Sequence, residues 1–298
     1  MQPLISVVIP YFNDGLYIDE AVDSILNQTY TNVEIIIVND CSTDPFSIDK
    51  ITNYNKPKTK VIHHTTNKHL SAARNTGFRE AKGEYVLTLD ADDMFEPSFL
   101  EKAIEILDTQ PSVGAVSAWA QCFGTSNFIW KPTGGSIENF LFRNNCVACA
   151  LIRKKVWEQL EGYDENMKKG YEDWYFWICA TALNWKIHVI QDPLFLYRKK
   201  ETSMLNDSFK NHVEIVGYIV SKNYNILSSY LKEMIICREE HIFKLENQNK
   251  ELKELIKNTQ NEIHNYIYKS KDYRLGNYIL RPLRQLKRLI NLYKNSFS

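Results

Sequence analysis

The stretch that most limits the fold is residues 85–93, which read Tyr-Val-Leu-Thr-Leu-Asp-Ala-Asp-Asp. Its apolar, β-forming part predicts a buried strand over 85–89. Asp90, Asp92 and Asp93 then lie at the carboxyl end of that strand, which is where ligands bind in an open α/β sheet. Because clustered carboxylates repel one another, one interpretation is a site for a divalent cation such as Mg²⁺, shared with substrate phosphates. The other is a solvated acidic turn that caps the following helix.

Strand and helix patterns alternate along the N-terminal part of the chain, and this order predicts the class of fold. Strands are predicted at 4–10, 33–38, 60–63, 85–89 and 113–119, with helices at 17–27, about 45–54, 71–81 and 97–107. Such alternation builds βαβ units with right-handed crossovers around a parallel sheet. The run Val-Glu-Ile-Ile-Ile-Val at 33–38 is almost wholly apolar, as expected for a strand buried on both faces. The expected fold is therefore α/β, Rossmann-like, with a mostly parallel sheet flanked by helices.

The carboxyl ends of two of these strands carry acids. Asp40 follows the strand at 33–38, and Asp90 follows the strand at 85–89. Parallel strands place these ends on one edge of the sheet, so the acids are expected near one another. The Gly-rich dinucleotide fingerprint and the Walker lysine loop are absent, which excludes a typical dehydrogenase or P-loop enzyme. A bound nucleotide would therefore depend on a metal and on basic side chains to hold its phosphates.

The second half of the chain predicts further short elements. Strands are predicted at 147–152, 186–190 and 193–198, and helices at 154–160 and 171–183. Glu172 and Asp173 open the last of these helices, which is rich in aromatic residues. Acids are favoured at a helix N-terminus by the helix dipole, so this pair needs no function to explain it. Cys146 and Cys149 have C-x-x-C spacing, but no second pair follows, and small buried residues are the favoured interpretation.

Charge and composition exclude several classes of function. The 298 residues hold 36 basic and 36 acidic side chains, so the overall charge favours neither nucleic acid nor membrane as a partner. The N-terminus lacks the basic region and cleavage site of a signal peptide, and no apolar run is long enough to span a membrane. The six cysteines are scattered, which favours reduced thiols and a cytoplasmic protein. His63, His64 and His69 show no metal-ligand spacing and are expected at the surface.

Six short motifs together resemble glycosyltransferase family 2, the inverting nucleotide-sugar glycosyltransferases with the GT-A fold. The motifs are Val7–Asn13, Ile37–Asp40, Ser71–Gly77, Leu89–Asp93, Glu172–Trp174, and Tyr197–Arg198 with Ser203–Met204. Each motif is weak alone, whereas their order and spacing are specific. The resemblance covers about residues 4–205, so a catalytic domain is expected over 1–205.

The resemblance implies that one set of residues binds the donor, with UDP as the expected nucleotide. Asp40 would receive the nucleobase, while Pro10 and Phe12 would shape the base and ribose pocket. Arg74 would contact the nucleotide, and Trp174 would help to wall the acceptor or sugar pocket. Without the resemblance, Asp40 is most simply an Asx turn after a strand.

The resemblance also implies a metal site and a catalytic base. Asp90 and Asp92 match the D-x-D motif: Asp92 would be the main ligand of Mn²⁺ or Mg²⁺, and Asp90 would face the ribose or support the metal. Asp93 would be a second ligand. The metal would neutralise charge on the leaving diphosphate. Glu172 and Asp173 match the E-D motif, and Asp173 would remove the proton of the acceptor hydroxyl.

One position departs from the family pattern. Family members often carry a His shortly after the Tyr-Arg pair, where it can complete the metal site, and this chain has Lys200 there. A protonated lysine cannot bind a metal, but it can contact a diphosphate as a point charge. We therefore expect weaker metal binding, with Arg198, Lys199 or Lys200 neutralising part of the diphosphate charge.

Beyond residue 205 the pattern turns helical and predicts a helical extension over 206–270. Ile235, Ile242, Asn249, Ile256 and Ile263 share one heptad position, and Leu245, Leu252, Thr259 and Tyr266 share another. About four heptads predict a coiled coil over 235–266, with Asn249 favouring a defined register and a homodimer. The alternative is a long helix packed on its own catalytic domain.

The last segment, 271–298, differs in charge from the rest of the chain. It holds seven basic residues and one acid, a net charge of +6, which leaves −6 on residues 1–270. Pro282 can begin a helix here. An apolar stripe then runs along one side: Leu283, Leu286, Ile290, Tyr293 and Phe297. This pattern is typical of a basic amphipathic helix at a membrane surface, where a lipid-linked acceptor would be met. The alternative is a helix that docks on the same protein.

These observations lead to one expected function and two alternatives. We expect a metal-dependent inverting glycosyltransferase that moves a sugar from a UDP-linked donor to a hydroxyl group in cell-surface polysaccharide or glycolipid synthesis. It would be cytoplasmic, and peripheral at the inner face of the membrane. The alternatives are a catalytically weak nucleotide- or carbohydrate-binding scaffold and a nucleotidyltransferase. A nucleotidyltransferase should carry a basic Gly-rich loop after the first strand, and residues 10–15 contain no Lys or Arg.

Overall fold

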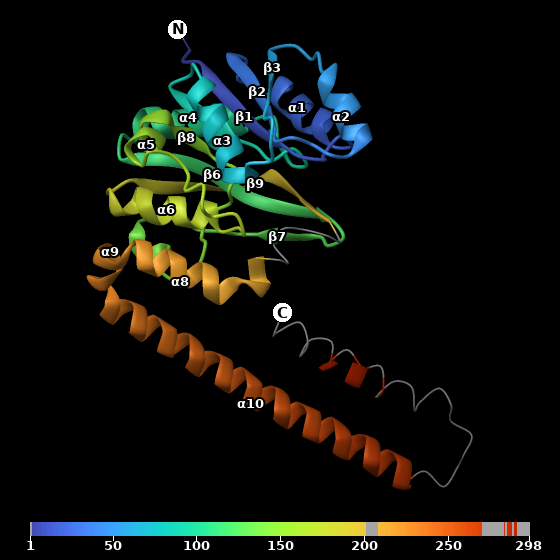
Figure 1. The fold of residues 1–298 in the computed structure, drawn as a ribbon. Helices are drawn as coiled ribbons and strands as arrows, with labels where there is room; N and C mark the ends of the chain where they lie inside the picture. Colours follow the sequence, from blue (N-terminus) through green and yellow to red (C-terminus); the bar gives the residue numbers. More distant parts are fainter. Residues whose placement is uncertain (1, 201–207, 270–282, 284, 288, 291–298) are drawn as a thin grey trace. The chain divides into compact units, whose positions relative to one another are not determined.

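The computed structural model describes residues 2–200, 208–269, 283, 285–287 and 289–290 (Figure 1). The strands are β1 (Ile5–Tyr11), β2 (Val33–Asn39), β3 (Thr59–His63), β4 (Tyr85–Thr88), β5 (Met94–Phe95), β6 (Val113–Gly124), β7 (Phe128–Trp130), β8 (Leu151–Arg153) and β9 (Lys186–Lys199). The helices of the sheet-containing part are α1 (Ile18–Leu26), α2 (Pro45–Thr52), α3 (His69–Glu80), α4 (Phe99–Thr109), the 3₁₀ turn η1 (Ile137–Asn139), α5 (Lys154–Gln159) and α6 (Glu172–Ala182). The C-terminal helices are α8 (His212–Lys222), α9 (Tyr224–Ser228) and α10 (Leu231–Lys269).

One mixed sheet forms the centre of the first part of the chain. Its strand order is β3-β2-β1-β4-β8-β6-β9-β5, with β7 paired to β6. The first four strands in this order run parallel, β8 is antiparallel to both of its neighbours, and β6 and β9 run parallel. Helices flank the sheet (Figure 1). The expected α/β fold with a mostly parallel sheet flanked by helices is confirmed.

Buried clusters on the two faces of the sheet hold the helices in place. Ile5, Val7 and Ile9 of β1 belong to one cluster, together with residues of α1 and α4. Val8 belongs to the other, together with residues of α3 and α6 and with Ile215 of α8. Because successive strand residues point to opposite faces, an unbroken apolar strand is buried on both sides.

The second half of the sheet departs from the sequence prediction. The strand predicted at 147–152 begins only at Leu151 and ends at Arg153. The two late strands predicted at 186–190 and 193–198 are one strand, β9. The register between β6 and β9 shifts around Pro193, and such an irregularity accommodates a residue that has no N–H to donate. Neither β5 nor β7 is predicted, because two- and three-residue strands are too short to show a periodic pattern.

The chain divides into two compact units, residues 1–229 and 230–298. The first therefore includes α8 and α9, so the compact sheet unit extends past the boundary predicted at 205. The second contains α10, a helix of 39 residues that spans the segment 235–266. Among the described residues, no helix is both long and apolar enough to span a membrane. The basic segment 271–298 lies almost wholly outside the described residues.

Candidate active site

A buried arginine joins two acidic sites that are far apart in the sequence. Arg74, on α3, has a side chain only 1% exposed. Its Nη2 donates to Asp90 Oδ1 at 2.8 Å, and its Nη1 donates to Glu172 Oε1 at 2.6 Å. Burial would lower the pKa of Arg74, but the two carboxylates outweigh it and raise that pKa. The structure thus places Arg74 between the end of β4 and the start of α6, and its predicted contact with a nucleotide stays a prediction.

Small residues on α3 allow this arginine to reach the sheet. A Cβ atom added at Gly77 would lie 2.2 Å from Val8 Cγ1, so only glycine permits α3 to pack this closely on β1. Ala73, beside Arg74, is buried in the same cluster as Val8. The Ser-Ala-Ala-Arg-Asn-Thr-Gly motif is therefore the part of α3 that packs against the sheet and carries Arg74 into the site.

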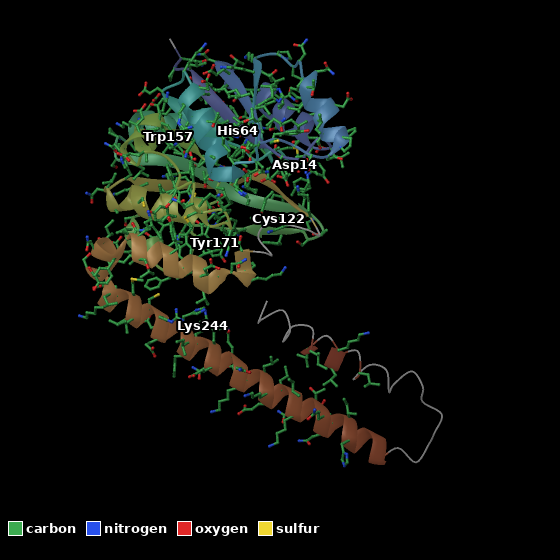
Figure 2. All side chains as sticks on the ribbon, in the orientation of Figure 1. Asp14, His64, Cys122, Trp157, Tyr171 and Lys244 are labelled. Atoms are coloured by element: carbon green, nitrogen blue, oxygen red, sulfur yellow. The ribbon has the colours of Figure 1, made fainter. Side chains whose placement is uncertain are left out.

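Lys200 forms ion pairs with two acids, one from each of two loops. Its Nζ lies 2.6 Å from Asp92 Oδ2 and 2.9 Å from Asp14 Oδ1 (Asp14 is labelled in Figure 2). Burial would lower the pKa of Lys200, but Asp92 and Asp14 outweigh it, so that pKa is raised and the ammonium group stays charged. The residue that departs from the family pattern therefore places a cation against the D-x-D motif.

Arg198 fixes the acidic turn from the end of β9. Asp93 is 1% exposed, and its Oδ1 accepts a hydrogen bond from Arg198 N at 2.8 Å. The Arg198 guanidinium donates through Nε to the Asp92 carbonyl oxygen at 2.9 Å and through Nη2 to Glu20 Oε2 at 2.6 Å. Burial, reinforced by Asp92, raises the pKa of Asp93 well above its usual range. The predicted contact between Arg198 and a nucleotide stays a prediction.

Asp173 lies in the first turn of α6 and is partly exposed. Its Oδ2 accepts from Asn144 Nδ2 at 2.6 Å, and its Oδ1 accepts from Trp174 N at 2.8 Å. Burial, followed by the charge of the adjacent Glu172, raises the pKa of Asp173 to about 7. A carboxylate whose pKa is near neutrality is well suited to take a proton from a substrate at physiological pH.

The start of α6 is held in an unusual backbone conformation. Tyr171, which precedes the helix, has φ = 61°, in the left-handed region that a bulky residue rarely adopts. Its hydroxyl lies 3.2 Å from His212 Nδ1 at the start of α8. An ion pair joins Lys169 Nζ to Glu214 on α8 at 2.6 Å. Because such strain persists only when the surroundings hold it, these contacts give α8 a role in placing the acids of α6.

Two of the predicted pocket residues lie on the first strand and loop, and one lies in the core. Pro10 is buried near the end of β1. Phe12, the first residue after that strand, is 40% exposed. Trp174 is only 6% exposed, and its Nε1 donates to the Phe140 carbonyl oxygen at 2.6 Å. The roles predicted for these three residues in shaping a pocket stay predictions.

Asp40 follows β2, and its side chain contacts His64, a residue that the sequence predicts at the surface. It is 4% exposed, and its Oδ1 lies 2.6 Å from His64 Nδ1. The prediction that His64 lies at the surface is wrong, because its side chain is only 6% exposed. His63 and His69 are exposed, as expected. A histidine just after a short strand gives no sign of such burial, which results from packing between the end of β3 and α3.

The donor atoms around Asp90 are suited in part to a metal ion. Within the described residues, ligand atoms of Asp90, Asp93 and Cys149 lie within 4.8 Å of one another. Burial raises the pKa of both Asp93 and Cys149, which disfavours the ionised forms that bind cations. Asp90 and Asp92 fit a hard cation better, since each uses one oxygen in an ion pair and no donor from the described residues contacts the other.

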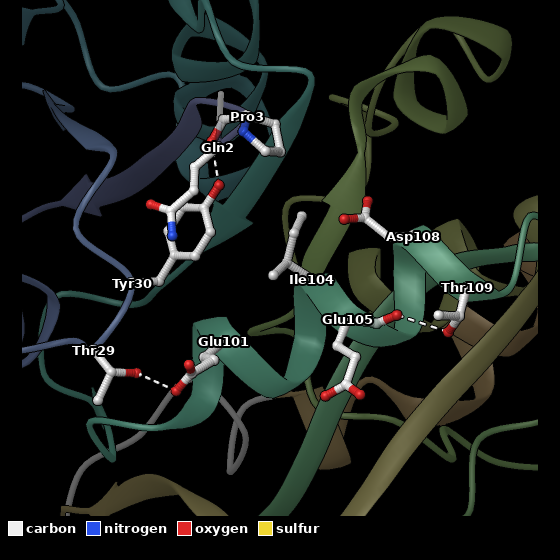
Figure 3. Close-up of a pocket in the computed structure, with 9 residues that line it drawn as sticks. All are labelled: Gln2, Pro3, Thr29, Tyr30, Glu101, Ile104, Glu105, Asp108 and Thr109. Atoms are coloured by element: carbon white, nitrogen blue, oxygen red, sulfur yellow. Dashed lines mark hydrogen bonds between the residues drawn. The ribbon is translucent and has the colours of Figure 1, made fainter.

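A surface pocket of about 630 Å³ lies apart from these acids (Figure 3). It includes Gln2 and Pro3, which precede β1, and one side of α4 from Glu101 to Thr109. Thr29 Oγ1 donates to Glu101 Oε2 at 2.9 Å beside it. Because the pocket is at the amino end of β1, whereas Asp40 and Asp90 follow the carboxyl ends of their strands, it is not part of the candidate active site.

Sequence reasoning misses three residues of the site. Asp14 lies in the loop directly after the Pro10 motif, so its proximity to the D-x-D motif follows from the parallel order of β1 and β4. Asn144 lies in an irregular segment that carries no periodic signal. The third residue is His64. Short polar residues in loops are common everywhere, so only their contacts distinguish these three from others.

Comparison with known proteins assigns the family. The family model described as Glycosyl transferase family 2 matches residues 6–200. An uncharacterized glycosyltransferase of Haemophilus influenzae is 38% identical over 245 residues, which cover 77% of this chain and 96% of that protein. Glycosyltransferase GlyG of Streptococcus pneumoniae is 29% identical over 236 residues, which cover 70% of this chain and 75% of GlyG.

Solved structures share the fold at lower identity. S. aureus TarS 1-349, in complex with UDP-GlcNAc, superposes with a TM-score of 0.58 at 22% identity, over 68% of this chain and 60% of that chain. Mannosyltransferase PcManGT from Pyrobaculum calidifontis, in complex with GDP-Man and Mn²⁺, gives a TM-score of 0.55 at 20% identity, over 68% of this chain and 59% of that chain. The expected GT-A fold is confirmed. With the family model spanning most of the sheet unit, this chain belongs to glycosyltransferase family 2.

Proposed function

We propose that this protein transfers a sugar from a uridine diphosphate donor to a hydroxyl group, with inversion at the anomeric carbon. The observation that carries the proposal is Asp173, a partly exposed carboxylate whose pKa is raised to about 7. Arg74, through its bonds to Glu172 and Asp90, links the helix that carries this base to the predicted donor site. TarS, which shares the fold, binds UDP-GlcNAc, and this supports a nucleotide sugar as donor.

Asp173 would act as the general base. Its two oxygens accept one hydrogen bond each, from Asn144 and from the Trp174 backbone, and a carboxylate has room for further donors. An acceptor hydroxyl would donate to it and lose its proton as the oxygen attacks the anomeric carbon. Such proton transfer typically contributes about 10²–10⁴-fold in rate. With one base on the side opposite the leaving diphosphate, a single displacement inverts the configuration.

The diphosphate would be bound at the carboxyl end of β4. Asp90 and Asp92 would hold Mn²⁺ or Mg²⁺ together with the diphosphate, and the buried Asp93 would be a second ligand beside them. When bound, the cation would supply positive charge to the leaving group. Lys200 already lies against Asp92 and Asp14, and it would contact the diphosphate when that pairing opens. PcManGT, which shares the fold, is in complex with GDP-Man and Mn²⁺, and this supports a metal bound together with a nucleotide sugar.

The test is transfer of sugar from UDP-sugars in the presence of Mn²⁺, with Asp173→Asn as the decisive variant. We expect kcat to fall by about 10²–10⁴-fold while binding of UDP changes by less than about threefold, because the base acts only in the chemical step. Asp192→Asn, an exposed acid on β9, is the matched control and should retain full activity. Unchanged transfer by Asp173→Asn would rule out this base. A chain that binds UDP but never transfers sugar would be a binding scaffold instead.

We propose further that α10 mediates a homodimer over 235–266. Ile235, Ile242 and Leu245 occupy predicted seam positions and are 54%, 38% and 46% exposed, which is costly for large apolar side chains. A second α10 that follows the same heptad register would cover them. Analytical ultracentrifugation at micromolar concentration should show a dimer, and the double variant Ile235→Glu, Ile242→Glu a monomer. A monomeric wild-type chain would contradict the proposal.

The acceptor is proposed to be a hydroxyl of a cell-surface polysaccharide or glycolipid precursor, met at the inner face of the membrane. The support is the basic amphipathic sequence pattern of 271–298, a segment that lies almost wholly outside the described residues. Flotation with anionic liposomes should recover the full chain and not a version that lacks 271–298. Equal recovery of the two would count against membrane association.

A further inference from the structure

His64 forms a buried bridge between the predicted nucleobase site and α3. Its ring lies with Nδ1 2.6 Å from Asp40 Oδ1 and Nε2 2.9 Å from Thr76 Oγ1 (His64 is labelled in Figure 2). Its backbone N donates to the Asn39 carbonyl oxygen at 2.9 Å. With both ring nitrogens in hydrogen-bond contact and a side chain only 6% exposed, the imidazole has one orientation relative to Asp40.

The two carboxylate oxygens of Asp40 differ in their surroundings. Oδ1 accepts from His64 Nδ1 and from Lys68 N, the latter at 2.9 Å. No donor from the described part of the chain contacts Oδ2. The Asp40 backbone N donates to the Tyr11 carbonyl oxygen at 2.9 Å, which ties Asp40 to the loop after Pro10. Asp40 therefore offers a ligand one oxygen, Oδ2, at the carboxyl edge of the sheet.

The contacts also determine which proton the histidine carries. An ionised carboxylate only accepts, so Nδ1 must be the N–H that donates to Asp40. In the neutral ring Nε2 then accepts from the Thr76 hydroxyl. The Asp40 carboxylate thus sets the tautomer, and the Thr76 hydroxyl, by donating to Nε2, holds the ring in the orientation that keeps Oδ1 of Asp40 occupied.

We infer that His64 is a positioning residue that makes Asp40 select a base with a single imino N–H, as in uracil or thymine, over guanine. This inference rests on the proposed function. Uracil and thymine present one N–H between two carbonyl groups, which matches one free carboxylate oxygen. Guanine presents N1–H and N2–H side by side, and this pair needs both oxygens of a carboxylate. Because Oδ1 is already filled by His64 and Lys68, guanine would bind with one donor unpaired, and an unpaired buried donor is costly.

The fold alone does not decide this choice, since relatives of the same fold bind UDP-GlcNAc in one case and GDP-Man in another. Asp40 alone does not decide it either, because an unrestrained carboxylate accepts from either base. The selectivity lies in the histidine behind the carboxylate.

The test is calorimetric binding of UDP, dTDP and GDP at saturating Mn²⁺. The wild-type chain should bind UDP or dTDP at least about tenfold more tightly than GDP, and the tighter of the two identifies the natural base. His64→Phe should bring the preference over GDP to within about threefold, because Oδ1 then keeps only the hydrogen bond from Lys68 N and can accept a second donor. His64→Asn should retain most of the preference, because its amide nitrogen occupies the place of Nδ1. His69→Asn, five residues away at a position with φ = 70° that Asn tolerates, should behave as wild type.

A change in the ratio of two affinities separates positioning from a general loss of structure, which would weaken all three nucleotides alike. The idea is overturned if wild type prefers GDP, or if His64→Phe keeps the wild-type ratio. Should His64→Phe fail to fold, Thr76→Val must reduce the same ratio by about threefold, and an unchanged ratio also overturns the idea. A wild-type chain that binds none of the three nucleotides would instead refute the proposed function, and this inference with it.

Discussion

The two acidic pairs of the site are alike in sequence and differ in charge balance. Asp90 and Asp92 follow β4, and each has a cationic partner within 2.8 Å. Glu172 and Asp173 open α6, and there only Glu172 has a cationic partner, Arg74. Asp173 receives hydrogen bonds from neutral groups alone, and its pKa is raised to about 7.

The difference teaches that neighbouring cations decide what a carboxylate can do. A carboxylate with a cation beside it stays ionised and is suited to hold positive charge, such as a metal ion or a further basic side chain. A partly buried carboxylate without one is drawn toward its neutral form and becomes able to exchange a proton near pH 7. The first pair is thus suited to binding a diphosphate with its cation, and the second to catalysing proton transfer.

The largest test of the comparison removes the cation that the two pairs share. Arg74→Met leaves the carboxylates of Asp90 and Glu172 without their partner inside the protein. We expect a loss of about 3–5 kcal/mol in the free energy of unfolding, as for other buried charges that lose a partner. Urea denaturation measures it. Arg79→Met, on the exposed side of the same helix where it pairs with Glu165, should change stability by less than about 0.5 kcal/mol. A small loss for both variants would show that Arg74 does not compensate the two acids.

A smaller effect is expected at the first pair when Lys200, the cation beside Asp92, is replaced by a residue that can bind a metal. Lys200→His removes an ammonium group that competes with a metal for Asp92 and adds a nitrogen donor. Mn²⁺ affinity, measured calorimetrically without donor, should rise about tenfold. Lys200→Met loses the charge and gains no ligand, so its Mn²⁺ affinity should lie between those of the wild-type chain and Lys200→His. If Lys200→Ala leaves activity titrated with Mn²⁺ unchanged, and Lys200→His shows no gain in affinity, Lys200 does not weaken the metal site.

At the second pair, Asp173→Asn should stabilise the protein at high pH, in contrast to the loss of activity expected from the same variant. The folded pKa of Asp173, about 7, lies above the unfolded value of about 3.9. The folded state therefore binds more protons between about pH 4 and pH 7, and its stability falls as pH rises through this window. Asn is neutral throughout. We expect Tm to rise by about 2–4 °C at pH 8 and to be unchanged at pH 4. The same shift at both pH values would mean that the charge is not the cause.

The smallest effect concerns the neutral partner of the base. Asn144 donates to Asp173, and this bond favours the ionised form. In Asn144→Ala the pKa of Asp173 should rise further, so the acidic limb of the pH profile of kcat should move up by about half a pH unit to one pH unit. Steady-state kinetics between pH 5 and 9 measure this limb. Asn166→Ala, an exposed control in the loop before α6, should leave the limb in place, and movement in both variants would contradict the role given to Asn144.

The parts of the site that the sequence predicts are those carried by regular elements. Asp40 and Asp90 end apolar strands, and Arg74 belongs to a motif of small residues, so periodicity and motif together place them. Two late strands are predicted where one exists, because the register shift near Pro193 depends on pairing with β6. Asn144 lies in an irregular segment, where no local pattern predicts its contact with Asp173.

By itself, the sequence determined the parallel order of the first strands, the position of the acids at their carboxyl ends and the family. Each follows from local hydrophobic patterns or from motifs that are continuous along the chain. Only the tertiary structure decided which charged neighbours those acids have. Arg74 bridges residues 16 and 98 positions away, and Lys200 reaches back to Asp14 over 186 positions. The electrostatics of a carboxylate depend on burial and on neighbours brought together by folding, so the features that suit one acid to binding and another to proton transfer appear only in three dimensions.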